Sequence, residues 1–398
     1  MSMGSTALSD ARNGRSVAVS RARSVARKQR ILMLVQLPPP EHGAAAVNRQ
    51  VVESAKLAES FDLDVAPISM MEDLAHIRRF EWSKIARSLK LCWTIAARLF
   101  GRARPDLVYF TLSPNGWAFY RDLVFVALFR IAGVPRVFHL HGRGVAAAIA
   151  RAPWRKPLYR FAFAQAFVIT LGGLLRRDID GLVDQDRVFV VPNGIRDMAD
   201  KPSAPRARTA GPVRILFLSN MLEEKGPFVL LEALAALARK GVPFEARFAG
   251  AWRKPLSPDD FAARVAALGL ERRVAHLGPV YGAAKAQAFA NADIFVLPTH
   301  YDHEALPLVA IEAMMHGLPV ITTKIGALPE IVVPGSSGEL IAPRDVLALA
   351  AALEQLIMDA DLRAAYGRAA RARFESDLTE ARFEERLLRV LVQAAERG

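Results

Sequence analysis

Two carboxylates near residue 300 are the side chains best placed to do chemistry. Glu304 follows the apolar run that ends at Leu297, and Glu312 lies in a helical segment that begins near Pro307 and stops at Gly317. Proline suits the first helical turn, and glycine suits the position just past the last one. In open parallel sheets, ligands gather at the carboxyl ends of strands, where a helix start also offers unpaired N–H groups to an anion. The stretch therefore predicts an anion-binding junction bracketed by two acids.

The spacing of the two acids excludes a hydrolytic pair. Helical geometry would place Glu304 and Glu312 about 12 Å apart along the axis, whereas paired glycosidase carboxylates lie about 5 to 9.5 Å apart. Apolar residues flank Glu312 on both sides, so a carboxylate buried there needs partners, and ligand hydroxyls would supply them. The alternative is that Glu312 lies on an exposed stripe of the helix, and spacing alone leaves both possibilities open.

Three more residues have types suited to a phosphate or sugar site. Lys225 precedes a glycine shortly after a predicted strand, and lysine serves as a point charge on phosphate. Gly43 opens a helical segment after a proline-rich loop, and His141 ends a predicted strand. Each also has an ordinary explanation, namely a solvated lysine, a turn glycine and a strand-end histidine.

Regular alternation of elements defines the fold class. Short apolar runs rich in β-branched residues alternate with longer segments of helical period, which predicts βαβ units and parallel sheets. The strands predicted in the first half are Ile31–Val35, Leu63–Ala66, Leu107–Phe110, Arg136–Leu140, Ala166–Thr170 and Val188–Val191. Those predicted in the second half are Val213–Leu218, Glu245–Ala249, Val274–Leu277, Ile294–Leu297 and Val320–Thr323. We therefore expect an α/β protein with two Rossmann-like, doubly wound parallel-sheet domains.

Length and composition support two domains. The chain has 398 residues, of which 52% are hydrophobic and 23% charged, enough for two globular cores. Four prolines between Pro192 and Pro212 interrupt regular structure and predict a hinge. The expected parts are a basic flexible tail at 1–29, a first domain at 30–195, a linker at 196–212, a second domain at 213–375 and a C-terminal helix at 376–398 that can cross back to the first domain.

Several short motifs in the sequence are informative through their order and spacing. Glu304 and Glu312, with seven residues between them, are followed by Ala313-Met314 and then by Gly317-Leu-Pro-Val-Ile. Other motifs are Ser219-Asn-Met-Leu-Glu-Glu-Lys-Gly226, Leu230-Leu-Glu-Ala233, Val191-Pro-Asn-Gly-Ile195, Gly278, Asp293–Pro298 and Gly326–Val332. Together they resemble the retaining glycosyltransferases of family 4, which have the GT-B fold. The resemblance covers most of the chain and implies two domains facing each other across a cleft that holds a nucleotide-sugar.

The resemblance implies a role for each candidate residue. Glu304 would hold hydroxyls of the donor sugar, Glu312 would hold the ribose, and Lys225 would neutralise the donor diphosphate. Gly43 would let the backbone approach the donor, and His141 would lie near the reacting centre. The implied catalytic residues are His141, Lys225 and Glu304, and the backbone around Ala305, Leu306, Pro307 and Leu308 would help to bind sugar and phosphate.

Three positions depart from the family pattern. The family usually has an arginine five residues before the lysine, where this chain has Asn220. Ala305 and Ala327 each replace a usual glycine. Because Asn220 removes a cation from the diphosphate site but still offers a hydrogen bond, we expect a change in donor preference or affinity and not a loss of activity.

Charge is concentrated in the first half. The net charge is +13; residues 1–195 hold 28 Lys and Arg against 15 Asp and Glu, whereas residues 196–398 hold 25 of each. Aromatic and basic residues interleave between Ile77 and Arg104, and Trp154–Arg160 forms a second basic patch. Such segments suit an anionic membrane surface, although a core helix with a solvated basic face is the alternative.

These features predict the partners. The donor would be a UDP- or GDP-sugar, and the acceptor a lipid-linked molecule or a polysaccharide in bacterial cell-surface polysaccharide or glycolipid synthesis, with Arg121 and Asp122 facing it. One cysteine, Cys92, and a seven-residue apolar run at 31–37 predict a cytoplasmic protein that can lie peripherally on the inner face of the plasma membrane. We expect no metal and no further cofactor.

Other functions fit less well. Gly142-Arg-Gly144-Val-Ala-Ala147 has the form of a dinucleotide fingerprint, but no Asp or Glu lies between Asp122 and Asp178 to hold a ribose. An NAD-dependent dehydrogenase is therefore disfavoured. A nucleotide-sugar epimerase of related fold and a non-catalytic basic module remain as alternatives. We expect no nucleic-acid binding, because no stacked aromatic-basic RNA signature is present.

Overall fold

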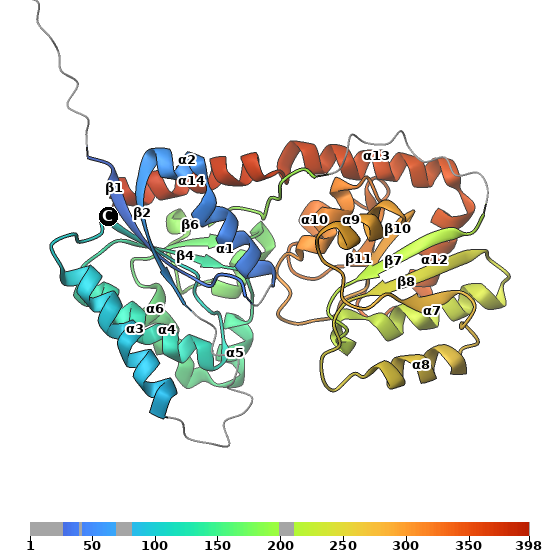
Figure 1. Ribbon diagram of the computed structural model, residues 1–398, viewed down its shortest axis with the longest axis horizontal. Helices are drawn as coiled ribbons and strands as arrows, with labels where there is room; N and C mark the ends of the chain where they lie inside the picture. The colour runs from blue at the N-terminus through green and yellow to red at the C-terminus, as the bar shows by residue number, and fades with distance from the viewer. Residues whose placement is uncertain (1–26, 40–41, 69–81, 199–210, 398) are drawn as a thin grey trace, which may run out of the picture.

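The protein forms two α/β lobes that lie side by side (Figure 1). The structure, a computed structural model, describes residues 27–39, 42–68, 82–198 and 211–397, with only the backbone course for 82–89. Three expected features lie wholly or mostly outside the described residues: the basic tail up to 26, the start of the basic segment at 77–81, and the hinge at 199–210.

Six strands build the sheet of the N-terminal lobe: β1 (Gln29–Val35), β2 (Phe61–Pro67), β3 (Leu107–Phe110), β4 (Arg136–Leu140), β5 (Phe167–Thr170) and β6 (Val188–Val190). They pair in parallel in the order β2-β1-β3-β4-β5-β6. All residues of β3, β4 and β5 are buried, as expected for a parallel sheet with helices on both faces.

Helices cover the two faces of this sheet. They are α1 (Gly43–Glu53), α2 (Ala55–Ser60), α3 (Trp82–Phe100), α4 (Gly116–Ile131), α5 (Val145–Arg151) and α6 (Lys156–Phe163), with short 3₁₀ turns η2 (Pro153–Arg155), η3 (Gly173–Ile179) and η4 (Gln185–Arg187). Helices α3, α4 and α6 pack their apolar side chains on one face, among them Leu99, Phe125 and Phe163. Helices α1 and α2 lie on the other face, where Val47 and Leu57 pack.

The C-terminal lobe repeats the design. Its strands are β7 (Val213–Leu218), β8 (Phe244–Ala249), β9 (Val274–His276), β10 (Ile294–Leu297), β11 (Val320–Thr323) and β12 (Gly338–Ile341), in the parallel order β12-β11-β10-β7-β8-β9. Its helices are η5 (Glu223–Lys225), α7 (Pro227–Arg239), α8 (Pro258–Ala267), α9 (Gly282–Ala290), α10 (Leu308–Met315), α11 (Leu328–Ile331), α12 (Val346–Met358) and α13 (Ala360–Asp377).

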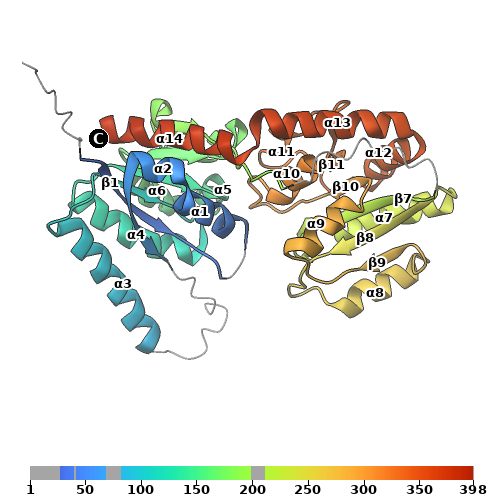
Figure 2. The same ribbon diagram turned by 45° about the horizontal axis from the view of Figure 1, so that its top comes forward.

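The last helix, α14 (Glu380–Arg397), belongs to the N-terminal lobe by its packing. Phe383, Leu387 and Leu391 are fully buried in the same apolar cluster as β1 and α1. Helices α13 and α14 lie end to end along one side of both lobes (Figure 2). The chain therefore passes between the lobes twice.

Most predicted elements agree with the structure. The α/β fold class is confirmed, and the bounds of β3, β4, β7, β10 and β11 match those predicted. Strand β12 was not predicted. Its sequence, Gly338-Glu-Leu-Ile, has only two apolar residues, and it pairs only with β11 at the edge of the sheet. Because an edge strand needs little apolar surface, this short strand lacks the apolar run that sequence pattern detects.

Candidate active site

The junction between β10 and α10 holds the first predicted acid. Pro307 was predicted to lie in the first helical turn, but it has extended geometry (φ −69°, ψ 126°) and is the cap residue immediately before α10 begins. Gly317 has a φ of +66° just past the helix end, as predicted. The polar loop from 298 to 307 therefore leads from the carboxyl end of β10 directly into a helix start.

Lys225 and Glu304 form an ion pair at this junction. Lys225 ends η5, and its ammonium group donates a hydrogen bond to Glu304 Oε2. The ammonium also lies 4.7 Å from the centre of the Tyr301 ring, and Thr299 Oγ1 lies 3.5 Å from the same carboxylate oxygen. The two side chains are only 13% and 10% exposed, so each charge offsets the desolvation of the other. The structure thus brings together two residues separated by 79 positions.

Close backbone approach fixes both halves of the pair. Gly226, with a φ of +85°, follows Lys225, and a Cβ there would lie 2.3 Å from the carbonyl oxygen of Pro298. Gly326, with a φ of +59°, lies so near that a Cβ would be 2.3 Å from the carbonyl oxygen of Ala305. Only glycine fits such positions. The two glycines therefore hold the lysine turn and the acidic loop against the end of β10.

Ala305 and Leu306 contribute backbone to this site. Both side chains are buried in the core of the lobe. The carbonyl of Ala305 accepts from Ala327 N–H at 2.7 Å, and that of Leu306 accepts from Asn193 Nδ2 at 3.2 Å. Any contact of these two residues with a ligand must therefore come from main-chain groups.

Glu312 is half-buried and has a protein partner. Its Oε1 accepts a hydrogen bond from Lys285 Nζ of α9 at 2.6 Å. Its Oε2 is buried and has no hydrogen-bond partner. Glu312 is thus not on a fully exposed stripe, and one oxygen remains available to a ligand hydroxyl. No local pattern pointed to Lys285, which lies 27 residues upstream of Glu312.

Gly43 and Leu308 bring the two lobes together. Gly43 begins α1, which is capped by His42 Nδ1 accepting from Ala45 N–H at 3.2 Å. A Cβ on Gly43 would lie 3.9 Å from the Leu308 side chain. Leu308 packs against apolar clusters of both lobes. The glycine-bearing loop of the first lobe therefore faces the start of α10.

His141 follows β4 and has two uncommitted nitrogens. Its ring centre lies 4.1 Å from that of His139, and both of its nitrogens are buried without a hydrogen-bond partner. Burial, reinforced by the nearby His42, lowers the pKa of His141 to about 3. His139 is itself held by Tyr109, whose hydroxyl lies 2.6 Å from His139 Nδ1. The imidazole of His141 is therefore neutral at physiological pH and able to donate to or accept from a ligand.

Within the described residues, Asn220, Arg121 and Asp122 form no hydrogen bond with Lys225, Glu304 or Glu312. Asn220 is exposed, and its carbonyl accepts from Leu222 N–H at 2.8 Å. Asp122 is fully buried and accepts from Ser113 N–H at 2.8 Å and from Arg121 at 2.7 Å. The Asp122 carboxylate is thus engaged by the protein, while Arg121 keeps a partly exposed side chain.

Three contacts that the sequence did not reveal join the lobes beside the site. Glu330 of α11 accepts from the N–H groups of Gly173 and Leu174, each at 2.7 Å. Asn115 Nδ2 lies 3.0 Å from His303 Nδ1, next to Glu304. Arg143 Nε donates to the carbonyl of Asp302 at 2.5 Å. The acidic loop is therefore tied to the first lobe just before Glu304, and α11 is tied to it at a second point.

The part of the chain that the structure describes shows neither a metal cluster nor a membrane-spanning helix. Those residues contain no group of three or more His, Cys, Asp or Glu side chains arranged to hold a metal ion. In the same ranges, every helix is too short or too polar to cross a bilayer.

The C-terminal lobe is similar to a known protein family. Residues 201–373 match the model of the family described as glycosyl transferases group 1. That range coincides with the C-terminal lobe, which carries Lys225, Glu304 and Glu312.

Curated relatives match over part of their length. A glycogen synthase of Mycobacterium tuberculosis (strain ATCC 25618 / H37Rv) is 36% identical over 190 residues, which is 48% of this chain and 44% of that protein. A D-inositol 3-phosphate glycosyltransferase of Arthrobacter sp. (strain FB24) is 32% identical over 195 residues, 47% of this chain and 46% of that protein. The alignments thus span slightly less than half of these relatives.

Solved structures match over nearly the whole chain. Anabaena Alr3699/HepE, solved in complex with UDP and glucose, superposes with a TM-score of 0.69 over 92% of this chain and 100% of that one, at 19% identity. Sucrose-phosphate synthase from Thermosynechococcus elongatus gives 0.72 over 93% and 100%, at 20% identity. The predicted GT-B fold is confirmed.

Proposed function

We propose that the protein is a glycosyltransferase that moves a sugar from a nucleoside-diphosphate sugar to an acceptor hydroxyl. The observation that carries this proposal is the Lys225–Glu304 pair at a strand-to-helix junction, opposite Gly43 and near Leu308. A cation, an acid and a helix start at one point suit a ligand that is a diphosphate at one end and a polyol at the other. The family match over the same lobe supports this assignment.

In this proposal the donor replaces a contact that the protein now makes with itself. Lys225 turns from Glu304 to the diphosphate, and Glu304 accepts from hydroxyls of the donor sugar. The free Oε2 of Glu312 takes a ribose hydroxyl while Lys285 stays on Oε1. Lys225 and the N–H groups at the start of α10 then stabilise the charge that develops on the departing diphosphate.

We further propose that transfer retains the anomeric configuration and needs no metal ion. The acceptor oxygen replaces the diphosphate oxygen at the anomeric carbon, and the acceptor proton leaves with the diphosphate. Neutral His141, with both nitrogens uncommitted, would bind the sugar near the reacting carbon. NMR of the product anomer tests retention, and unchanged turnover in EDTA tests metal independence.

The proposal also names a class of donor and a class of acceptor. Similar structures in complex with UDP and with UDP-glucose make UDP-sugars the first donors to try, followed by GDP-sugars. The excess positive charge of residues 1–195 favours a lipid-linked or polysaccharide acceptor at an anionic membrane on the cytoplasmic side. Bacterial cell-surface polysaccharide or glycolipid synthesis would use such an enzyme.

Thermal shift with nucleotide-sugars tests the core of the proposal. A donor at about 100 times its dissociation constant adds about 2.7 kcal/mol to the free energy of unfolding. We expect one of UDP-, GDP- or ADP-glucose to raise the melting temperature, and Lys225→Ala to abolish the rise. No shift with any of them at millimolar concentration would contradict the assignment, and conversion of the donor to an epimer without acceptor would favour an epimerase.

A further inference from the structure

The outer face of the N-terminal lobe exposes large apolar side chains on adjacent helices. Trp117, Val124 and Ile131 are exposed along α4, Trp154 is exposed on η2, and Phe161 on α6. Trp117 and Trp154 are 73% and 63% exposed, which is unusual for the largest apolar side chain. Helix α4 contacts α6, and Trp117 and Trp154 line a common pocket.

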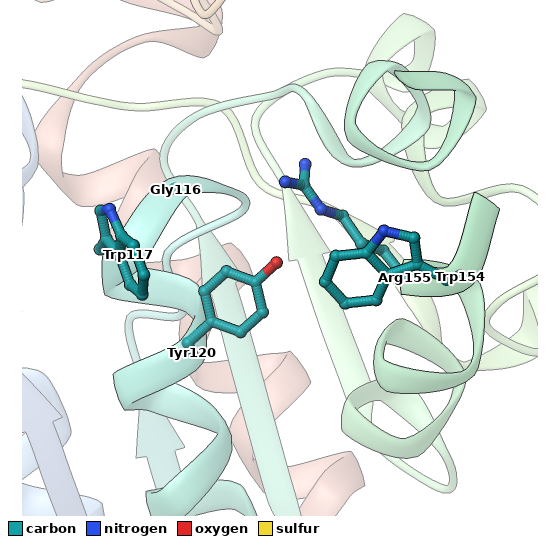
Figure 3. A pocket seen from close by; sticks show the side chains of 5 residues that line it. All are labelled: Gly116, Trp117, Tyr120, Trp154 and Arg155. Atoms are coloured by element: carbon teal, nitrogen blue, oxygen red, sulfur yellow. The ribbon is translucent and has the colours of Figure 1, made fainter. Parts of the chain in front are cut away.

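A pocket of about 470 Å³ opens between the two tryptophans. Trp117 and Tyr120 of α4 line one side, Trp154 and Arg155 of η2 line the other, and Gly116 completes the wall. Figure 3 shows the rings of Tyr120 and Trp154 facing each other across this space, with the Arg155 guanidinium at one end. The walls are almost entirely apolar ring surface.

Arg155 supplies the polar feature of the pocket. Its guanidinium carbon lies 5.4 Å from the centre of the Trp154 ring, and its Nε is buried without a hydrogen-bond partner. A buried donor without a partner is costly, and an anion would satisfy it. The pocket therefore combines apolar walls with one cation that lacks a full set of partners.

The surrounding surface is basic and almost free of acids. Helices α3 to α6 and η2 contain a single acidic residue, Asp122, which is fully buried. The basic residues on α4, α5, η2 and α6 are Arg121, Arg130, Arg151, Arg155, Lys156 and Arg160. Charge complementarity thus favours an anionic occupant.

The pocket adjoins the contact between the lobes. Gly116 follows Asn115, whose amide lies 3.0 Å from His303, the residue before Glu304. Tyr159 OH donates to the carbonyl of Pro114 at 2.8 Å and so fixes the loop that leads into α4. A molecule in the pocket therefore has a short path to the acidic loop.

We propose that this pocket seats the apolar chain of a phosphate-bearing lipid, the membrane-borne end of the acceptor. The inference rests on the proposed function and specifies the acceptor class. The ring walls bury the chain next to its headgroup, and Arg155 binds the phosphate. A free saccharide fits less well, because the walls offer few groups to its hydroxyls.

Dodecyl phosphate below its critical micelle concentration is the probe. Its binding is followed by intrinsic fluorescence, since two tryptophans line the pocket. We expect saturable binding that inorganic phosphate does not compete away, and weaker binding of the neutral dodecyl maltoside. Trp154→Ala and Trp117→Ala should each weaken binding about tenfold, and Arg155→Met should remove the preference for the phosphate. Trp93→Ala is the matched control, because Trp93 is 76% exposed on α3 but does not line the pocket.

Four results would overturn the proposal that the pocket binds a phosphate-bearing lipid. Equal loss in Trp93→Ala, absence of saturable binding, or binding of an oligothymidylate in place of dodecyl phosphate would each overturn the inference. Binding to phosphatidylglycerol vesicles that is insensitive to Trp117→Ala and Trp154→Ala would assign the surface to bulk lipid and also overturn it. Thermal shift with UDP-, GDP- and ADP-glucose, run on every variant, reports folding and the donor site. Failure of that shift with intact dodecyl phosphate binding would reject the proposed function alone.

Discussion

The two lobes share an architecture but differ in how the residues of their candidate sites are partnered. In the C-terminal lobe Lys225 is paired with Glu304 and Lys285 with Glu312, although Glu312 Oε2 has no partner. In the N-terminal lobe both nitrogens of His141 and Nε of Arg155 are buried without partners. The net charge follows the same division, with all of the +13 in residues 1–195.

This difference in partners indicates which kind of ligand suits each lobe. An ion pair within the protein offsets the desolvation of both charges when no ligand is bound. When a charged ligand binds, it can replace one member of the pair. Unpartnered polar groups and exposed aromatic rings leave a cost that only another molecule can remove. In our proposals the second lobe binds a small soluble donor, and the first lobe meets a larger amphipathic partner.

The largest expected effect comes from breaking the Lys225–Glu304 pair. Lys225→Ala should lower turnover about 10²- to 10³-fold, because the cation that offsets charge on the leaving diphosphate is lost. Initial rates with a confirmed donor measure this. Lys240→Ala is the control, since Lys240 forms an exposed pair with Glu354. Unchanged turnover in Lys225→Ala would remove this lysine from the mechanism, provided that circular dichroism shows both variants folded.

A smaller effect should follow from separating the lobes. A Cβ on Gly172 would lie 2.4 Å from Ala327 Cβ and 2.5 Å from Glu330 Oε1, across the lobe contact. Gly172→Ala should therefore push the lobes apart, increase the radius of gyration in solution scattering and lower turnover by a factor of a few. Gly173→Ala is the matched control, because its nearest atom would be Glu330 Oε2 at 3.5 Å. Equal behaviour of the two variants would show that this contact does not govern function.

The smallest effect concerns acid stability of the first lobe. Burial lowers the pKa of His141 to about 3 in the folded protein, whereas an unfolded histidine titrates near its usual value of about 6.5. The unfolded state therefore binds more protons between these values, and stability falls as pH decreases from about 6.5 towards 3. His141→Asn should reduce the loss of melting temperature between pH 7 and 4.5 by a few degrees. The exposed His303, replaced by Asn, serves as the control, and an identical acid response in both would contradict the assignment.

Sequence reasoning succeeded where pattern and packing coincide. Buried strands such as β3 and β10 are apolar throughout, so their bounds followed from composition. Gly317 was placed correctly because a helix end requires a φ that glycine adopts readily. The order of motifs predicted that Lys225 and Glu304 share a site, but their direct ion pair was not predicted and is found in the structure.

The sequence could not reveal contacts between distant segments that have no local pattern. Lys285 looks like any helical lysine until α9 packs beside α10, and Glu330 appears as part of a short turn until it reaches Gly173. The aromatic pocket requires α4 and η2, which are separated by more than twenty residues, to lie together. Such features depend on tertiary placement, which periodicity does not encode.

The crossing of α14 determines how the protein can be divided. Gly194 lies so close to the returning chain that a Cβ would be 2.3 Å from the carbonyl oxygen of Thr379. The N–H of Ile195 donates to the carbonyl of Leu378 at 3.0 Å, and the carbonyl of Ile195 accepts from Glu380 N–H at 2.9 Å. The two passages between the lobes are therefore joined to each other by backbone hydrogen bonds at this point. A fragment that ends at residue 195 would leave bare the apolar groove that Phe383, Leu387 and Leu391 occupy. The first lobe should fold alone only when its missing tail helix is supplied, as a fused or added peptide.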